Sequence, residues 1–126
     1  MTSYLLDTHA FIWWLENSKQ LSPHARGLIA NPNANVYVSH ASLWEIAIKQ
    51  SIGRLEFPVE LLDSLLDDNG FELLTIKTAH IIQSSTLPLH HRDPFDRLLI
   101  AQAQIESFGL ISKDSHFPDY DIDLYW

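Results

Sequence analysis

The segment Asp93–Ala103, with the sequence DPFDRLLIAQA, largely decides how this chain of 126 residues is interpreted. Asp93 and Pro94 predict the start of a helix, because aspartate caps a first turn and proline fits the first helical position. We expect this helix to run through Glu106, with Gly109 ending it. This places Asp96 one turn inside the helix, before a mostly apolar stretch. Asp93 already supplies the negative charge that suits a helix start, so a second acid at Asp96 indicates a chemical role.

Three more carboxylates lie where an expected strand ends or an expected helix begins. Asp7 follows the apolar run 4–6 and Asp114 follows the run 110–112. Glu45 is set in a largely apolar helical segment, where we expect it to be partly buried and to need a cation. The carboxyl ends of parallel strands share one edge of a sheet, where ligands bind. Carboxylates crowded there repel one another unless they share protons or a cation. A hard divalent ion, Mg²⁺ or Mn²⁺, is the natural occupant, which points to metal-assisted phosphodiester hydrolysis.

Each of these acids also has an ordinary structural interpretation. Asp7, Asp93 and Asp114 are good helix or turn caps, and such a cap contributes roughly 1 kcal/mol. Glu45 can pair with Lys49 one turn further along its helix, which contributes only a few tenths of a kcal/mol. The functional interpretation therefore depends on the shared position of the acids and not on any one of them.

Apolar runs bounded by turn residues alternate between the lengths typical of strands and of helices. We expect strands at 4–6, 36–39, 71–76, 110–112 and 122–125, and helices at 9–15, 22–30, 42–50, 58–66, 78–85 and 94–106. This alternation predicts a three-layer α/β/α fold around a short parallel sheet of four to five strands, in a single domain spanning 1–126.

Composition limits the possible functions. The chain has no cysteine, which excludes disulfides, zinc–thiolate sites and thiol catalysis. It has no visible secretory signal and no apolar run long enough to cross a bilayer, so a cytoplasmic protein is expected. The net charge of −8 disfavours nonspecific binding to nucleic acid. However, Lys49, Arg92, Arg97 and Lys113 lie near the acids in sequence, which predicts a locally positive rim.

Other catalytic groups give weaker signals. His9, His90 and His91 lie near the acids but lack the spacing of a zinc site, so we expect them to face substrate at most. A phosphatase of the haloacid type also begins with an aspartate at a strand end, but it needs a second aspartate two residues later. His9 occupies that position here. The serines have no convincing histidine–acid partners for a serine hydrolase.

The sequence blocks around these acids resemble those of the PIN-domain ribonucleases, and in particular the VapC-type toxins of bacterial toxin–antitoxin pairs. The matching blocks are Leu5–His9, Ser42–Lys49 and Asp93–Ala103, and the last is the most specific. Ile111–Asp114 resembles the closing Thr-x-Asp motif of that family, with serine in place of threonine. The resemblance covers the whole chain.

The resemblance implies a Mg²⁺- or Mn²⁺-dependent endoribonuclease that forms homodimers and is covered by an antitoxin. The implied metal-binding and catalytic residues are Asp7, Glu45, Asp96 and Asp114, with Asp93 as an auxiliary acid. We further expect Thr8 or Ser112 to orient a ligand or water, and Lys49 or Arg97 to contact a substrate phosphate.

Two alternatives remain open. The apolar segment His9–Leu15, with Phe11, Trp13 and Trp14, is either a dimer or antitoxin surface or simply part of the core. The chain as a whole is either the ribonuclease or a catalytically silent binding module that keeps the fold and sequesters a partner.

Overall fold

The computed structural model describes residues 2–90 and 93–126, which form a parallel sheet with the strand order β3-β2-β1-β4-β5. The strands are β1 (Ser3–Leu6), β2 (Asn35–Ser39), β3 (Glu72–Leu74), β4 (Gly109–Ile111) and β5 (Leu124–Tyr125). Leu6 at the end of β1 pairs with Val38 of β2 and with Ile111 of β4. The carboxyl ends of these three central strands therefore lie at the same edge of the sheet.

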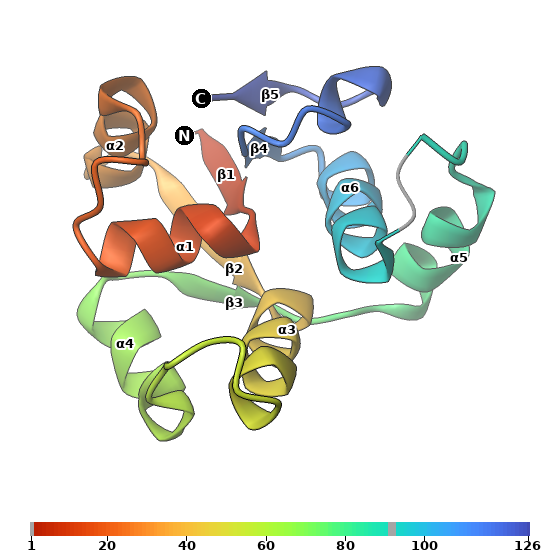
Figure 1. The fold of residues 1–126 in the computed structure, drawn as a ribbon. Helices are drawn as coiled ribbons and strands as arrows, with labels where there is room; N and C mark the ends of the chain where they lie inside the picture. Colours follow the sequence, from red (N-terminus) through yellow and green to blue (C-terminus); the bar gives the residue numbers. More distant parts are fainter. Residues whose placement is uncertain (1, 91–92) are drawn as a thin grey trace.

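Helices alternate with the strands and cover both faces of the sheet. They are α1 (Thr8–Leu15), α2 (Pro23–Ala30), α3 (His40–Ser51), α4 (Leu62–Asp68), α5 (Thr78–Thr86) and α6 (Pro94–Glu106), with short 3₁₀ turns η1 (Val59–Leu61) and η2 (Phe117–Asp119). Figure 1 shows α1, α2 and α4 on one side of the strands and α5 and α6 on the other. The predicted three-layer fold is confirmed.

The core is divided by the sheet, as the two-residue period of a strand requires. Tyr4 and Leu6 of β1 face the layer that contains Phe11 of α1. Leu5, between them, faces the layer that contains Leu99 of α6. Leu5, Leu6, Phe11 and Leu99 are fully buried, and each such side chain contributes about 1.5–3 kcal/mol relative to exposure.

The C-terminal end of α6 differs from the prediction that Gly109 ends this helix. Ser107 caps the helix in the left-handed conformation, with φ of 59°, and Gly109 opens β4 instead. A Cβ atom at Gly109 would lie only 2.6 Å from the ring of Tyr125 and 3.1 Å from that of Tyr4. Glycine is therefore needed at this position because two aromatic rings pack against the backbone.

Two other predicted elements are shorter or divided. The helix expected over 58–66 begins as the 3₁₀ turn η1 and continues as α4 to Asp68, because no side chain caps its first turn. The strand expected over 71–76 is regular only over Glu72–Leu74. Within the described ranges 2–90 and 93–126, no helix is both long and apolar enough to cross a membrane.

Candidate active site

Three helices begin beside the carboxyl ends of the central strands. β1 leads through Asp7 into α1, β2 leads through Ser39 into α3, and α6 begins at its cap Asp93. Helix α3 packs against both α1 and α6, near the centre of Figure 1. This arrangement brings acids from distant parts of the sequence to one edge of the sheet.

Asp7 is buried at the end of β1, where it caps α1. Its Oδ1 accepts a hydrogen bond of 2.7 Å from the backbone N–H of Ala10. The pKa of Asp7 is raised to about 6, mainly by burial, with a smaller contribution from the negative charge of Asp114 and opposing hydrogen bonds from Ser112 and Ala10. The capping interpretation of Asp7 is correct, and the same carboxyl group also faces a second acid.

Glu45 is buried within α3, with 5% of its surface exposed. The Thr8 hydroxyl donates a hydrogen bond of 2.7 Å to Glu45 Oε1, and Lys49 Nζ lies 2.8 Å from Oε2. The pair with Lys49 was expected from their spacing, and so was the burial of Glu45. Ser42, whose hydroxyl lies 3.0 Å from that of Thr8, was not predicted as part of the site. Its only signal in the sequence is its place one turn before Glu45.

Asp96 gives the clearest sign that the acids converge. The pKa of Asp96 is raised to about 8, mainly by burial. The negative charges of Asp93, Glu45, Asp114 and Asp7 supply the rest of this rise, in that order of size. The charges of four other acids therefore act on Asp96, although these residues are spread across the sequence from β1 to the turn after β4.

Asp93 and Asp114 also hold the backbone in place. Asp93 Oδ1 accepts hydrogen bonds from the backbone N–H groups of Phe95, at 2.9 Å, and Asp96, at 3.1 Å. Asp114 Oδ1 accepts one of 2.8 Å from the backbone N–H of His116, as expected for a capped turn. Both caps fix the direction in which the neighbouring chain approaches the site.

Ser112 connects two of the acids. Its hydroxyl oxygen accepts a hydrogen bond of 3.0 Å from the backbone N–H of Asp114, and its side chain is hydrogen-bonded to Asp7. Ser112 is 1% exposed, so water does not compete for these bonds. The serine of the 111–114 block therefore sets the positions of the acids before and after it.

An open hollow of about 350 Å³ lies over two of the acids, Asp7 and Asp114. It is lined by Asp7, His9, Lys113, Asp114, Ser115 and His116. Lys113 Nζ lies 4.8 Å from the centre of the Trp13 ring, in a cation–π contact. Lys113 lines this hollow and Lys49 lies beside Glu45, whereas Arg92 and His91 lie outside the described residues. The positive rim remains a prediction. The ring of His90 packs against Tyr120, with centroids 5.3 Å apart.

Arg97 has a structural role that the sequence did not reveal. Its guanidinium donates hydrogen bonds to the backbone carbonyls of Ser84, Leu87 and Pro88, at 2.9, 3.0 and 2.9 Å. These bonds tie α6 to the end of α5 and to the segment that follows it. The expected contact between Arg97 and a substrate phosphate remains a prediction.

The donor chemistry of the site fits Mg²⁺ or Mn²⁺. Carboxylate oxygens are the ligands that these hard cations prefer. The pKa of Asp7 and of Asp96 is raised first by burial and then by the charges of neighbouring acids. Across residues 2–90 and 93–126, no group of three or more acidic or histidine side chains is already arranged around one ion position. Asp7 and Glu45 are instead engaged with Ala10, Thr8 and Lys49. The acids therefore lie close together, but within the described residues their side chains are not yet arranged as ligands around one ion.

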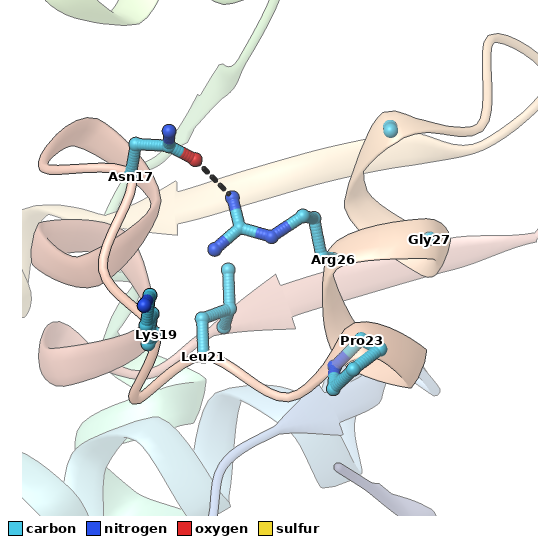
Figure 2. Close-up of a pocket in the computed structure, with 7 residues that line it drawn as sticks. Asn17, Lys19, Leu21, Pro23, Arg26 and Gly27 are labelled. Carbon is cyan, nitrogen blue, oxygen red and sulfur yellow. Dashed lines mark hydrogen bonds between the residues drawn. The ribbon is translucent and has the colours of Figure 1, made fainter.

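A larger hollow, of about 660 Å³, lies at the other end of α1 and contains none of the predicted site residues. Figure 2 shows that Asn17 and Arg26 face each other across it, joined by a hydrogen bond of 2.9 Å. Its remaining lining residues are Lys19, Leu21, Pro23, Gly27 and Ala30. Without an acid, histidine or nucleophile, this hollow offers no catalytic chemistry.

Comparison with known proteins identifies the class to which this fold and site belong. The sequence profile of the PIN domain matches residues 4–123, so the chain belongs to the PIN-domain family. The predicted family and fold class are confirmed.

Individual relatives lie within one branch of that family. The chain is 27% identical over 117 residues to ribonuclease VapC22 of Mycobacterium tuberculosis, covering 90% of this chain and 88% of the relative. Its fold is similar to that in VapBC2 of Rickettsia felis bound to a promoter DNA fragment, with a TM-score of 0.73, 17% identity and 99% of each chain covered. A toxin–antitoxin complex from Klebsiella pneumoniae is also similar, with a TM-score of 0.68, 17% identity and coverage of 98% and 96%.

Proposed function

We propose that this PIN-domain protein is a metal-dependent endoribonuclease that acts as the toxin of a toxin–antitoxin pair. The observation that carries the proposal is the convergence of four other carboxylates on the buried Asp96, whose pKa is raised first by burial and then by their charges. Such a cluster is unfavourable without a cation and is suited to binding one. The similarity to ribonuclease VapC22 supports RNA as the substrate.

Asp7, Glu45, Asp96 and Asp114 would hold Mg²⁺ or Mn²⁺, with Asp93 as an auxiliary acid. When bound, the ion neutralises the acids, activates water and stabilises the charge that develops on the phosphate. This neutralisation also reconciles the net charge of −8 with an RNA substrate, because the acids closest to the phosphate no longer repel it.

The protein's own polar groups orient these acids. Thr8 of α1 holds Glu45 and also contacts the Ser42 hydroxyl of α3, and Ser112 holds Asp7 and the backbone of Asp114. Because Lys49 lies beside Glu45 and is partly exposed, we assign it a contact with a substrate phosphate. Preorganisation of this kind lowers the cost of ordering the site when the substrate arrives.

An RNA cleavage assay in Mg²⁺, in Mn²⁺ and in EDTA tests the proposal. The wild-type protein is expected to cut single-stranded or structured RNA only with a divalent ion. Asp7→Asn and Asp96→Asn should abolish cleavage without loss of folding. Asp63→Asn, which removes an exposed acid on α4, is the matched control and should retain it. If Asp96→Asn still cleaved RNA, the assignment of Asp96 as a metal-binding catalytic residue would be wrong.

Exposed apolar side chains mark where partners would bind. The apolar α1 is largely core, because Phe11 is fully buried and Trp13 and Trp14 pack against the same cluster. Trp44 of α3 and Ile82 of α5 are instead 63% and 60% exposed. We assign these outer faces of α3 and α5 to protein contacts, either with an antitoxin or in a homodimer. Light scattering of wild type and Ile82→Asp, alone and with a co-expressed antitoxin, checks this assignment.

A catalytically silent binding module remains the second candidate. It is favoured by the ion pair between Lys49 and Glu45, which neutralises one acid without any metal. This alternative predicts no RNA cleavage with either ion and unchanged partner binding in Asp96→Asn. Metal-dependent cleavage by wild type that Asp96→Asn lacks would exclude it.

A further inference from the structure

A second hollow, of about 240 Å³, lies next to the one over the acids. His9 lines both hollows, so its exposed ring separates them. Trp13, Lys49 and Arg54 line the second hollow only. The two hollows are therefore neighbours on either side of His9, and the second is lined by no proposed metal ligand.

The second hollow has an aromatic wall. The His9 ring packs on Trp13 with centroids 5.3 Å apart and planes tilted by 32°. Trp126 contacts the same indole edge to face, with centroids 5.9 Å apart, and this holds the indole in place. Nucleic-acid bases stack on aromatic side chains whatever the base, because each base has a π face.

Two cations, Lys49 and Arg54, line the same hollow. Lys49 is already paired with Glu45, with its side chain 39% exposed. Arg54 is exposed, and its guanidinium makes no hydrogen bond or ion pair within residues 2–90 and 93–126. A guanidinium suits phosphate because it donates two parallel hydrogen bonds. Glu16, at the end of α1, is the acid that faces this hollow.

The size of the hollow limits what it holds. Sites for drug-sized ligands are typically about 300–1,000 Å³, so 240 Å³ accommodates one small planar group. A base inside a duplex is stacked and paired and cannot enter such a space. Unpaired bases of loops and single strands can be turned outward and stacked on side chains.

We propose that this hollow binds one unpaired base of the RNA strand beside the scissile phosphate, with Arg54 contacting the adjoining phosphate. The base would stack against the His9–Trp13 pair. This inference rests on the proposed ribonuclease function. It adds where a part of the RNA outside the metal site would bind. It predicts that cleavage prefers unpaired positions in RNA.

The hollow can be tested without any cleavage. The probes are the four nucleoside 5′-monophosphates, with ribose 5-phosphate as the control that lacks a base. The readout is the set of indole N–H signals in a nitrogen–proton NMR spectrum, which the four tryptophans provide. We expect saturable shifts of the Trp13 signal with nucleotides and none with ribose 5-phosphate. The Trp14 signal should stay unchanged, because its indole N–H donates to Asn69 at the far side of α1.

Variants then connect the hollow to RNA. Arg54→Gln should weaken nucleotide binding, while Lys19→Gln, an equal change of charge at the other end of α1, should not. Trp13→Leu should raise the KM for RNA roughly 5- to 150-fold with little change in kcat, as loss of one stacked base predicts. Trp14→Leu is the matched control for lost packing. If Trp13→Leu does not fold, nucleotide binding by Arg54→Gln still tests the base site, because Arg54 is exposed and its replacement should not disturb folding.

The outcomes separate this inference from the proposed function. If nucleotides shift the Trp13 NMR signal but the protein cuts no RNA, the base-binding site is supported and the proposed ribonuclease function is refuted. RNA cleavage with unchanged KM in Trp13→Leu and Arg54→Gln would retain the ribonuclease and refute the base site. Equal shifts with ribose 5-phosphate, or shifts only with an aromatic peptide of a protein partner, would also refute it.

Discussion

The Thr8 hydroxyl donates a hydrogen bond of 2.7 Å to the Glu45 carboxylate, joining residues that are 37 positions apart. Thr8 opens α1 directly after Asp7, and Glu45 lies within α3. The bond therefore fixes the distance between two helices that begin at neighbouring strand ends. Because Thr8 follows Asp7, any shift of α1 relative to α3 also moves Asp7.

Replacing Thr8 with valine tests this link, since valine has the same shape and lacks the hydroxyl. Glu45 would lose a buried hydrogen bond to a charged group, which typically contributes about 1.5–3 kcal/mol. We expect a loss of this size in the free energy of unfolding, measured by urea denaturation, together with weaker Mn²⁺ binding. Thr8→Ser keeps the hydroxyl and should lose less than half as much. Equal losses in both variants would show that packing and not the hydroxyl matters.

Asp96 makes stability depend on pH. Its pKa is about 8 in the folded protein, against an ordinary aspartate value of 3.8 in the unfolded chain. Between these values the folded protein holds a proton that the unfolded chain has released. Metal-free stability should therefore fall as pH rises from about 4 to about 8, with a smaller contribution from Asp7 up to about pH 6. Asp96→Asn should flatten this profile and be more stable than wild type near pH 8. Identical profiles for both proteins would contradict the raised pKa.

Ser112 is expected to control metal affinity through Asp7. Its hydrogen bond lowers the pKa of Asp7, so Ser112→Ala should raise that pKa further and leave more of the carboxyl group protonated near pH 6. Mn²⁺ affinity, measured by calorimetry, should fall more at pH 6 than at pH 8. Ser112→Thr retains the hydroxyl and should preserve the affinity. A pH-independent loss in Ser112→Ala would indicate a general disturbance of the turn.

We expect substitution of Arg97 to lower the stability of the fold more than it lowers the affinity for substrate. Arg97→Gln removes a guanidinium that donates to three carbonyls, and hydrogen bonds from charged donors contribute about 1.5–3 kcal/mol each, with incomplete additivity. We expect a loss of about 2–4 kcal/mol in the free energy of unfolding. Arg97→Lys should recover only part of it, because an ammonium group cannot span the same acceptors. A stable variant with a raised KM would instead favour the phosphate contact.

The layers of the fold and the grouping of the acids could be predicted from the sequence for one physical reason. Strand ends in a parallel sheet share an edge, so acids at the ends of the runs 4–6 and 110–112 had to meet. The burial of Glu45 also followed from its apolar neighbours. The long helix after Asp93 was correctly bounded because Asp93 and Pro94 mark its start locally.

Other features depend on contacts between distant residues and left no local signal. The requirement for glycine at Gly109 comes from the ring of Tyr125, which lies on a neighbouring strand. The carbonyls that Arg97 binds belong to a different helix and the segment after it. The contact of Ser42 with Thr8 requires α1 and α3 to pack first. None of these pairings follows from periodicity or capping patterns.

The most direct test of the central claim is a thermal-unfolding titration of wild type and Asp7→Asn with Mn²⁺ and with Mg²⁺. It needs no knowledge of the RNA, and Asp63→Asn serves as the control of equal charge change. We predict saturable stabilisation of wild type and Asp63→Asn, by about 2.7 kcal/mol at an ion concentration of 100 times Kd, and none in Asp7→Asn. Equal stabilisation of Asp7→Asn, or no stabilisation of wild type by either ion, would contradict a carboxylate metal site at the end of β1.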